Sequence, residues 1–152
     1  MANAITLDID LDSGTVEPVP QPPGQGDVAE LSENAILNLQ LRNGWAPGTY
    51  IRRVEFFGQT SAPTHTQPGP PPGTSPIGTW SAGTTTPTSI DGKFDVQAST
   101  TQPSIVEVKD VQNITQGEER YWYRVTMSDG RTLDPEVINK SGSGTATWTS
   151  KH

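Results

Sequence analysis

The feature that most constrains the fold of this chain is the alternation of apolar and polar residues over short runs. In residues 5–12, four aliphatic side chains alternate with Thr6 and three aspartates, Asp8, Asp10 and Asp12. A period of two places one set of side chains against a core and the other in water, as in a half-buried strand. Similar runs cover residues 36–42, 49–57, 94–99, 104–111 and 121–128, and no helical pattern of useful length interrupts them. The pattern therefore predicts an all-β protein.

The spacing of these runs indicates an antiparallel β-sandwich of about seven to nine strands. Turn signals such as Asn43-Gly44 and Asp129-Gly130 separate the strand patterns. In residues 49–57 the alternation predicts that Tyr50, Arg52, Val54 and Phe56 share a face. We expect a single domain over residues 1–152, because this length suffices for one core. Residues 13–34 and 58–89 are rich in Pro and Gly and are expected to form long irregular loops.

Two segments resemble immunoglobulin-like sandwiches. The stretch GEERYWYRVTMSDG is similar to the strand and hairpin that end such domains, with Tyr121 at the position of the corner tyrosine. Tyr123 stands at the position of the cysteine, and the chain contains no Cys. The stretch VAELSENAILNLQL resembles the turn and strand near the N-terminus of these domains. The resemblance implies an immunoglobulin-like sandwich and says nothing about function.

The charge of the chain is concentrated near its N-terminus. Residues 1–41 contain seven acidic residues and no Lys or Arg, whereas the remainder contains ten residues of each sign, so the net charge of −7 belongs to the first segment. Nucleic acid is disfavoured as a partner, since phosphate binding needs clustered Lys and Arg. An acidic segment of this kind can steer a basic partner.

The three alternating aspartates could suggest a calcium loop. If Asp8 were its first residue, the required glycine would be replaced by Ser13 and the closing glutamate by Val19. We therefore predict no metal site, keep a calcium-dependent binder as a third alternative, and interpret the aspartates as the wet face of a strand.

The arginines suggest a partner for that strand. Opposite charges across neighbouring strands stabilise a sheet. We hypothesise that the aspartates face an Arg-bearing strand in this chain or in a second copy, with Arg52, Arg53 and Arg124 as candidates.

Catalytic chemistry and cofactors are not predicted. His65 lies in a Pro-rich segment and His152 ends the chain, and no nucleophile, phosphate-loop or dinucleotide motif accompanies them. The chain has no visible secretory signal and no apolar stretch that could span a bilayer, so we expect a cytoplasmic protein without a membrane partner. Release from the cell, or assembly into a larger particle, stays open.

Three tryptophans suggest an alternative function in glycan binding. Alternation places Trp122 on the outward side of its strand, and Trp45 and Trp80 are expected in loops. Burial of these rings is the simpler interpretation, because large aromatics are highly buried on average. The preferred prediction is a non-catalytic structural or interaction protein that self-associates or docks on a protein partner; a carbohydrate-binding module is the alternative.

Overall fold

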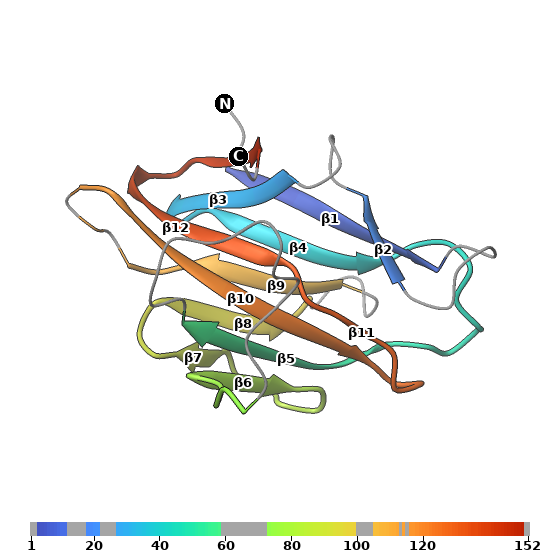
Figure 1. The fold of residues 1–152 in the computed structure, drawn as a ribbon. Helices are drawn as coiled ribbons and strands as arrows, with labels where there is room; N and C mark the ends of the chain where they lie inside the picture. Colours follow the sequence, from blue (N-terminus) through green and yellow to red (C-terminus); the bar gives the residue numbers. More distant parts are fainter. Residues whose placement is uncertain are drawn as a thin grey trace.

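The described part of the chain folds as two β-sheets that pack face to face (Figure 1). The computed structural model describes residues 3–11, 18–21, 27–58, 73–99, 105–112, 114 and 116–150. These residues form thirteen strands and no helix, so the prediction of an all-β, sandwich-like fold is confirmed, whereas the prediction of seven to nine strands is too low.

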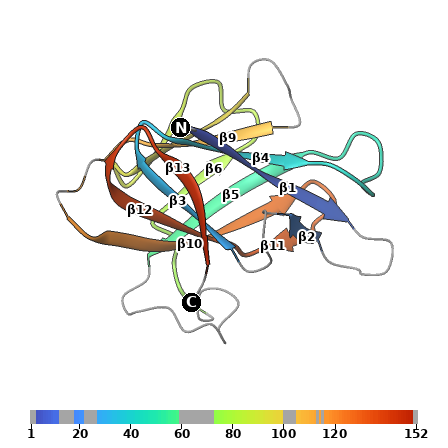
Figure 2. The same ribbon diagram turned by 90° about the horizontal axis from the view of Figure 1, so that it is seen from above.

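Sheet A has six strands. In spatial order they are β2 (Pro18–Gln21), β1 (Ala4–Leu11), β4 (Ile36–Leu41), β9 (Ile105–Asp110), β8 (Phe94–Ala98) and β7 (Thr88–Ile90). Sheet B contains β13 (Ala146–Ser150), β3 (Asp27–Glu33), β12 (Glu136–Ser143), β10 (Glu118–Met127), β5 (Ile51–Gly58) and β6 (Gly78–Ser81), in that order. The short strand β11 (Thr132–Leu133) pairs with β10 in sheet B. Seen from above, β13 and β3 lie side by side although they come from opposite ends of the chain (Figure 2).

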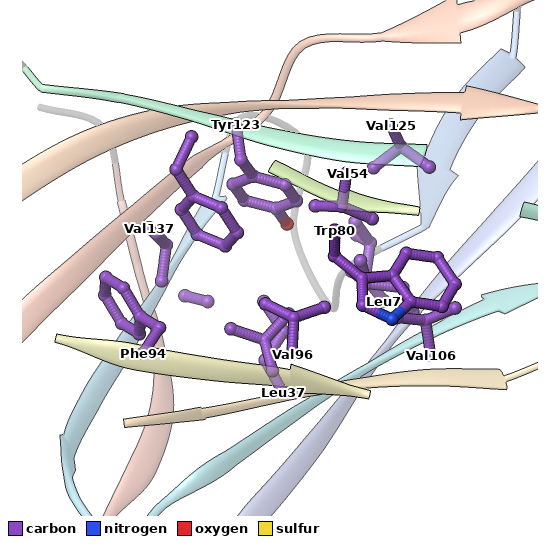
Figure 3. Packing of buried hydrophobic residues seen from close by; sticks show 14 of the residues in the cluster. Leu7, Leu37, Val54, Trp80, Phe94, Val96, Val106, Tyr123, Val125 and Val137 are labelled. Carbon is purple, nitrogen blue, oxygen red and sulfur yellow. The ribbon is translucent and has the colours of Figure 1, made fainter. Parts of the chain in front are cut away.

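Alternation determines which side chains enter the core. In β4, Leu37, Leu39 and Leu41 are buried, while the residues between them are half-buried on the outer face of sheet A. Leu7, Leu37, Phe94, Val96 and Val106 of sheet A approach Val54, Trp80, Tyr123, Val125 and Val137 of sheet B (Figure 3). An aromatic cluster joins the layers, because Phe56 of sheet B stacks on Phe94 of sheet A with ring centroids 5.3 Å apart.

A β-bulge changes the face predicted for β5. Thr126 of β10 pairs with Arg53, but the next residue, Met127, pairs with Ile51, so Arg52 has no opposite residue in β10. An extra residue of this kind reverses the alternation on one side of the bulge. Ile51 therefore enters the core, and the prediction that Tyr50 and Arg52 share a face with Val54 is wrong, since both are exposed.

Two strand pairs are parallel, which corrects the prediction of an antiparallel sandwich. Strand β1 runs parallel to β4, and β3 runs parallel to β12. Strand β3 was missed because it lies between β12 and β13, where Val28, Ala29, Leu31 and Ser32 are all buried. A strand that is buried on both faces does not alternate in sequence.

The predicted irregular loops contain strands. Strands β2 and β3 fall within residues 13–34, β6 falls within residues 58–89 and β7 begins at residue 88, so these strands were missed by the loop prediction. Prolines are tolerated in β2 because it is an edge strand of sheet A. Residues 73–77 and 82–87 are described and contain no strand, and residues 13–17, 22–26 and 59–72 of the predicted loops lie outside the described residues.

The outermost strands of both sheets are short. β2 and β7 bound sheet A with four and three residues, and β13 and β6 bound sheet B with five and four residues. Short edges disfavour the addition of a further strand from another chain. The faces of the sheets, rather than these edges, are therefore the better places to seek a binding surface.

Candidate functional site

The outer face of sheet A is polar and acidic. Asp8 and Asp10 of β1, Asp95 of β8 and Glu107 of β9 lie on this face with Lys109, and we call these five residues the acidic face. The residues beside each acid in its strand point into the core, so the acids point outward. All four acids are half-buried on this face. Exposed Arg42 follows β4 beside β1, so four carboxylates stand against two cationic side chains, and this part of the molecule keeps a negative field.

The turn after β4 holds the acidic strand β1 in place. The backbone and side-chain nitrogens of Asn43 both donate hydrogen bonds to Asp10 Oδ1 at 3.3 Å. The Leu11 amide donates to the Asn43 carbonyl at 2.7 Å, and the Trp45 indole nitrogen donates to the Ile9 carbonyl at 2.9 Å. These contacts from one turn determine where the Asp10 carboxylate lies.

A shallow hollow opens in the acidic face between β8 and β9. Its volume is about 240 Å³, and its lining is made of Ile36, Pro87, Asp95, Gln97, Glu107 and Lys109. The Gln97 amide donates to Glu107 Oε1 at 3.3 Å across the two strands. The hollow therefore presents carboxylate oxygens that a cationic side chain could reach.

The three candidate arginines, Arg52, Arg53 and Arg124, lie on the other side of the sandwich, in β5 and β10 of sheet B. Arg53 is 3.3 Å from Glu55, and Arg124 donates to Asp134 Oδ1 at 2.7 Å, which raises the pKa of its guanidinium. The Arg124 guanidinium also stacks over the Phe57 ring at 5.4 Å. These two arginines therefore have carboxylate neighbours within the chain, whereas Arg52, on the bulge, and Arg42, which follows β4 in sheet A, are exposed and have no ion pair among the described residues.

The predicted pairing with arginines of the same chain is wrong for Asp8 and Asp10. Strand β1 lies between β2 and β4, where Asp8 is opposite Gln21 and Gln40. The arginine-bearing strands β5 and β10 belong to sheet B. Asp12 lies outside the described residues. Pairing with a second copy stays a prediction.

The three tryptophans proposed for glycan binding do not share a surface. Trp80 lies in β6 rather than in a loop, faces the core opposite Val54, and is 1% exposed. Trp122 lies on the outer face of sheet B as the alternation predicted, but it is only 8% exposed. Trp45 is half-buried in the turn that holds β1. No two of these rings combine into an exposed platform in the described part of the chain.

A polar cluster between the sheets was not anticipated from the sequence. Its members, called the Asp110 network, are Lys93, Asp110 and Gln112 from the sheet A side and Glu119, Tyr121 and Asn139 from sheet B. Glu119 Oε1 accepts from the Tyr121 hydroxyl at 2.9 Å, from the Asn139 amide at 3.1 Å and from Lys93 Nζ at 3.4 Å. Lys93 Nζ also donates to Gln112 Oε1 at 2.9 Å. Polar contacts thus join the two sheets at this end of the sandwich.

The two acids of this network have opposite pKa shifts. Burial of Asp110 raises the pKa of its carboxyl to about 7, and the charges of Glu33 and Glu119 add to this effect against one backbone hydrogen bond from Gln112. Burial also pushes the pKa of Glu119 upward, but hydrogen bonds from Tyr121 and Asn139, together with Lys93, outweigh it and lower this pKa. The sequence did contain a signal, since Asp110 continues the inward positions of Val106 and Val108.

The described residues were compared with the requirements of a metal site and of a membrane-spanning helix, and the chain was compared with known proteins. Within the described ranges, no three His, Cys, Asp or Glu side chains are placed to hold a metal ion together. None of the described segments is a helix long and apolar enough to cross a membrane. His65 and His152 lie outside the described residues. Comparison with protein families gave no matching family model, and comparison with curated proteins gave no matching protein.

Proposed function

We propose that this protein is a non-catalytic interaction domain that docks on a protein partner with a basic surface through its acidic face. The observation that carries the proposal is the gathering of Asp8, Asp10, Asp95 and Glu107 from three strands onto one outer face with a single lysine. A charged face of this kind increases the rate of encounter with a partner of opposite sign and selects against acidic competitors.

The ion pairs on sheet B favour a different protein over a second copy as the partner. Arg53 and Arg124 are held beside Glu55 and Asp134, so a second copy would have to separate these pairs before its arginines could meet the aspartates. The chain also carries a net charge of −7, so two copies repel each other. Self-association is thus the less favoured form of the same function.

The edge strands support binding through a face. Outer strands of three to five residues offer few unpaired backbone groups to an added strand. For the architecture, we propose an immunoglobulin-like sandwich, supported by the pairing of the Tyr121–Tyr123 strand β10 with β5 and β12. No observation favours the glycan alternative, because Trp80 and Trp122 are buried.

A cationic probe tests the proposal. A short lysine-rich peptide is titrated into the wild type and into the double variant Asp8→Asn/Asp10→Asn, which keeps side-chain shape and removes two charges. Exposed ion pairs contribute roughly 0.2–1 kcal/mol each, so the double variant should bind about 2-fold to 30-fold more weakly. Added salt should reduce wild-type binding and narrow this difference.

A charge-matched control distinguishes binding through the acidic face from a general effect of the net charge. The double variant Asp91→Asn/Glu118→Gln also removes two exposed acids, but these lie outside the acidic face. It should bind the peptide about as well as the wild type, and an equal loss in both double variants would refute the proposed face. Light scattering over a concentration series supplies the second test. If the average molecular mass rises with protein concentration in Asp8→Asn/Asp10→Asn as it does in the wild type, self-association uses a surface other than the acidic face.

A further inference from the structure

Asp110 lies where three segments of the chain meet at one end of the sandwich. Its carbonyl accepts from the Asn34 amide at 2.7 Å, its amide donates to the Ala35 carbonyl at 2.9 Å, and the next amide, of Val111, donates to the Lys93 carbonyl at 3.0 Å. Two of the turns that meet here contain non-glycine residues with positive φ, Asn34 at 74° and Asp91 at 53°. Such backbone is held only by its surroundings, so this end is sensitive to changes in its contacts.

The side chains at this end include more buried acceptors than donors. Asp110 and Asn139 are both fully buried. Asp110 Oδ1 accepts a hydrogen bond from the backbone nitrogen of Gln112 at 3.0 Å. Asp110 Oδ2 and Asn139 Oδ1 have no hydrogen-bond partner in the described structure. A buried acceptor without a donor is destabilising, and an ionised carboxylate in that position more so.

The charged groups that face Asp110 do not offset a negative charge there. Glu33 of β3 and Glu119 of β10 act directly on Asp110, and Asp91, in the turn between β7 and β8, adds a negative charge near the neighbouring Tyr121. Lys93 is the nearby cation in the described network, and its ammonium group is already bound to Gln112 and Glu119. The buried phenol of Tyr121 donates to Glu119 and is not a source of charge, since burial raises its pKa well above the usual value.

We propose that Asp110 binds a proton in the folded protein and that release of this proton loosens the contact between the two sheets at this end. The inference is independent of the proposed partner. A protonated carboxyl supplies a donor to a network that is short of donors, whereas the ionised form adds a buried charge beside Glu33 and Glu119. At the end of the sandwich where Asp110 lies, the two sheets are therefore held together in weak acid and more loosely above neutral pH.

The direction of the effect follows from linkage. The pKa of Asp110 is raised from 3.8 to about 7 in the folded state, so an opened or unfolded state releases this proton first. Closing is therefore increasingly opposed as the pH rises from about 4 to about 7, and the effect levels off above that. Glu119 has the opposite shift, so its stabilising contribution is lost only as the pH falls below the ordinary glutamate range.

Hydrogen exchange of the amides of Asn34, Asp110 and Val111 reports local opening at this end. After correction for the intrinsic pH dependence of exchange, the opening constant in the wild type should rise about fifty-fold between pH 5 and pH 7 and level off above pH 8. In Asp110→Asn, which has the same shape and cannot ionise, it should not change with pH. The matched control Asp95→Asn, on the outer face of the same sheet, should retain the wild-type response.

A direct titration keeps the inference testable if Asp110→Asn does not fold. The carboxyl carbon of Asp110 is followed by NMR in the wild type, and a midpoint near 7 is expected. A midpoint below about 5 would overturn the inference, because the group would then be ionised at neutral pH like an ordinary aspartate. Equal pH dependence of opening in the wild type and in Asp110→Asn would also overturn it.

Discussion

Substitution of Gly44 should disturb the turn that positions the acidic strand. Gly44 has a φ of +87°, and a Cβ added there would lie 1.8 Å from the backbone oxygen of Leu11. Backbone cannot yield as a flexible side chain can, so the turn or the end of β1 must move. Gly48, in the same loop, has a φ of +86° and nothing within 4 Å of an added Cβ, and it is therefore a matched control.

The magnitude follows from two contributions. An L-residue at positive φ costs about 1–2 kcal/mol, and this contribution is common to Gly44→Ala and Gly48→Ala. In Gly44→Ala the displaced turn also loses hydrogen bonds such as Leu11 to Asn43 and Trp45 to Ile9, each contributing about 0.5–1.5 kcal/mol. We expect about 1–2 kcal/mol of destabilisation for Gly48→Ala and about 2–5 kcal/mol for Gly44→Ala.

Urea denaturation of both variants measures this difference. The midpoint should fall further for Gly44→Ala while the slope stays the same, because the change acts on the folded state. Gly44→Ala should also weaken binding of the lysine-rich peptide although it removes no charge, since the Asn43 contacts to Asp10 are displaced. Equal losses of stability in the two variants would refute the steric reasoning.

Three further predictions concern stability. Asp110→Asn should stabilise the protein by about 1–4 kcal/mol at pH 8, because it removes the unfavourable ionisation of a buried group whose pKa is about 7. The gain should be smaller at pH 5, and urea denaturation at pH 5 and pH 8 measures the difference. Arg124→Ala should cost about 1 kcal/mol through loss of the Asp134 pair and the stacking on Phe57, and high salt should remove part of the difference from wild type. Phe94→Ala should cost about 3–5 kcal/mol because it leaves a cavity between the sheets, whereas the same truncation at exposed Ile77 should cost under about 0.5 kcal/mol; a single thermal melt of each variant distinguishes the two.

The inward and outward positions of several strands were predictable because each has one face in water. Leu7 and Ile9 in β1, and Leu37 and Leu39 in β4, occupy the core as their alternation indicated. The aspartates beside them are on the outer face for the same reason, so the acidic character of one surface was readable from local pattern alone. Strand β3 was not readable, since burial on both faces removes the alternation on which the prediction relied.

Pairing between distant segments was decided only by the tertiary structure. Local sequence determines which side of a strand is apolar, but it does not specify which strand lies next to it or in which direction that neighbour runs. For this reason Asp8 and Asp10 lie opposite glutamines and proline-bearing β2 rather than arginines, and Trp80 enters the core from an edge strand. The sequence by itself determined which positions of the alternating strands are charged and which are apolar. The tertiary structure decided which charged residues become neighbours. It also encloses Asp110 between the two sheets beside Glu119, because residues far apart in the chain pack together there.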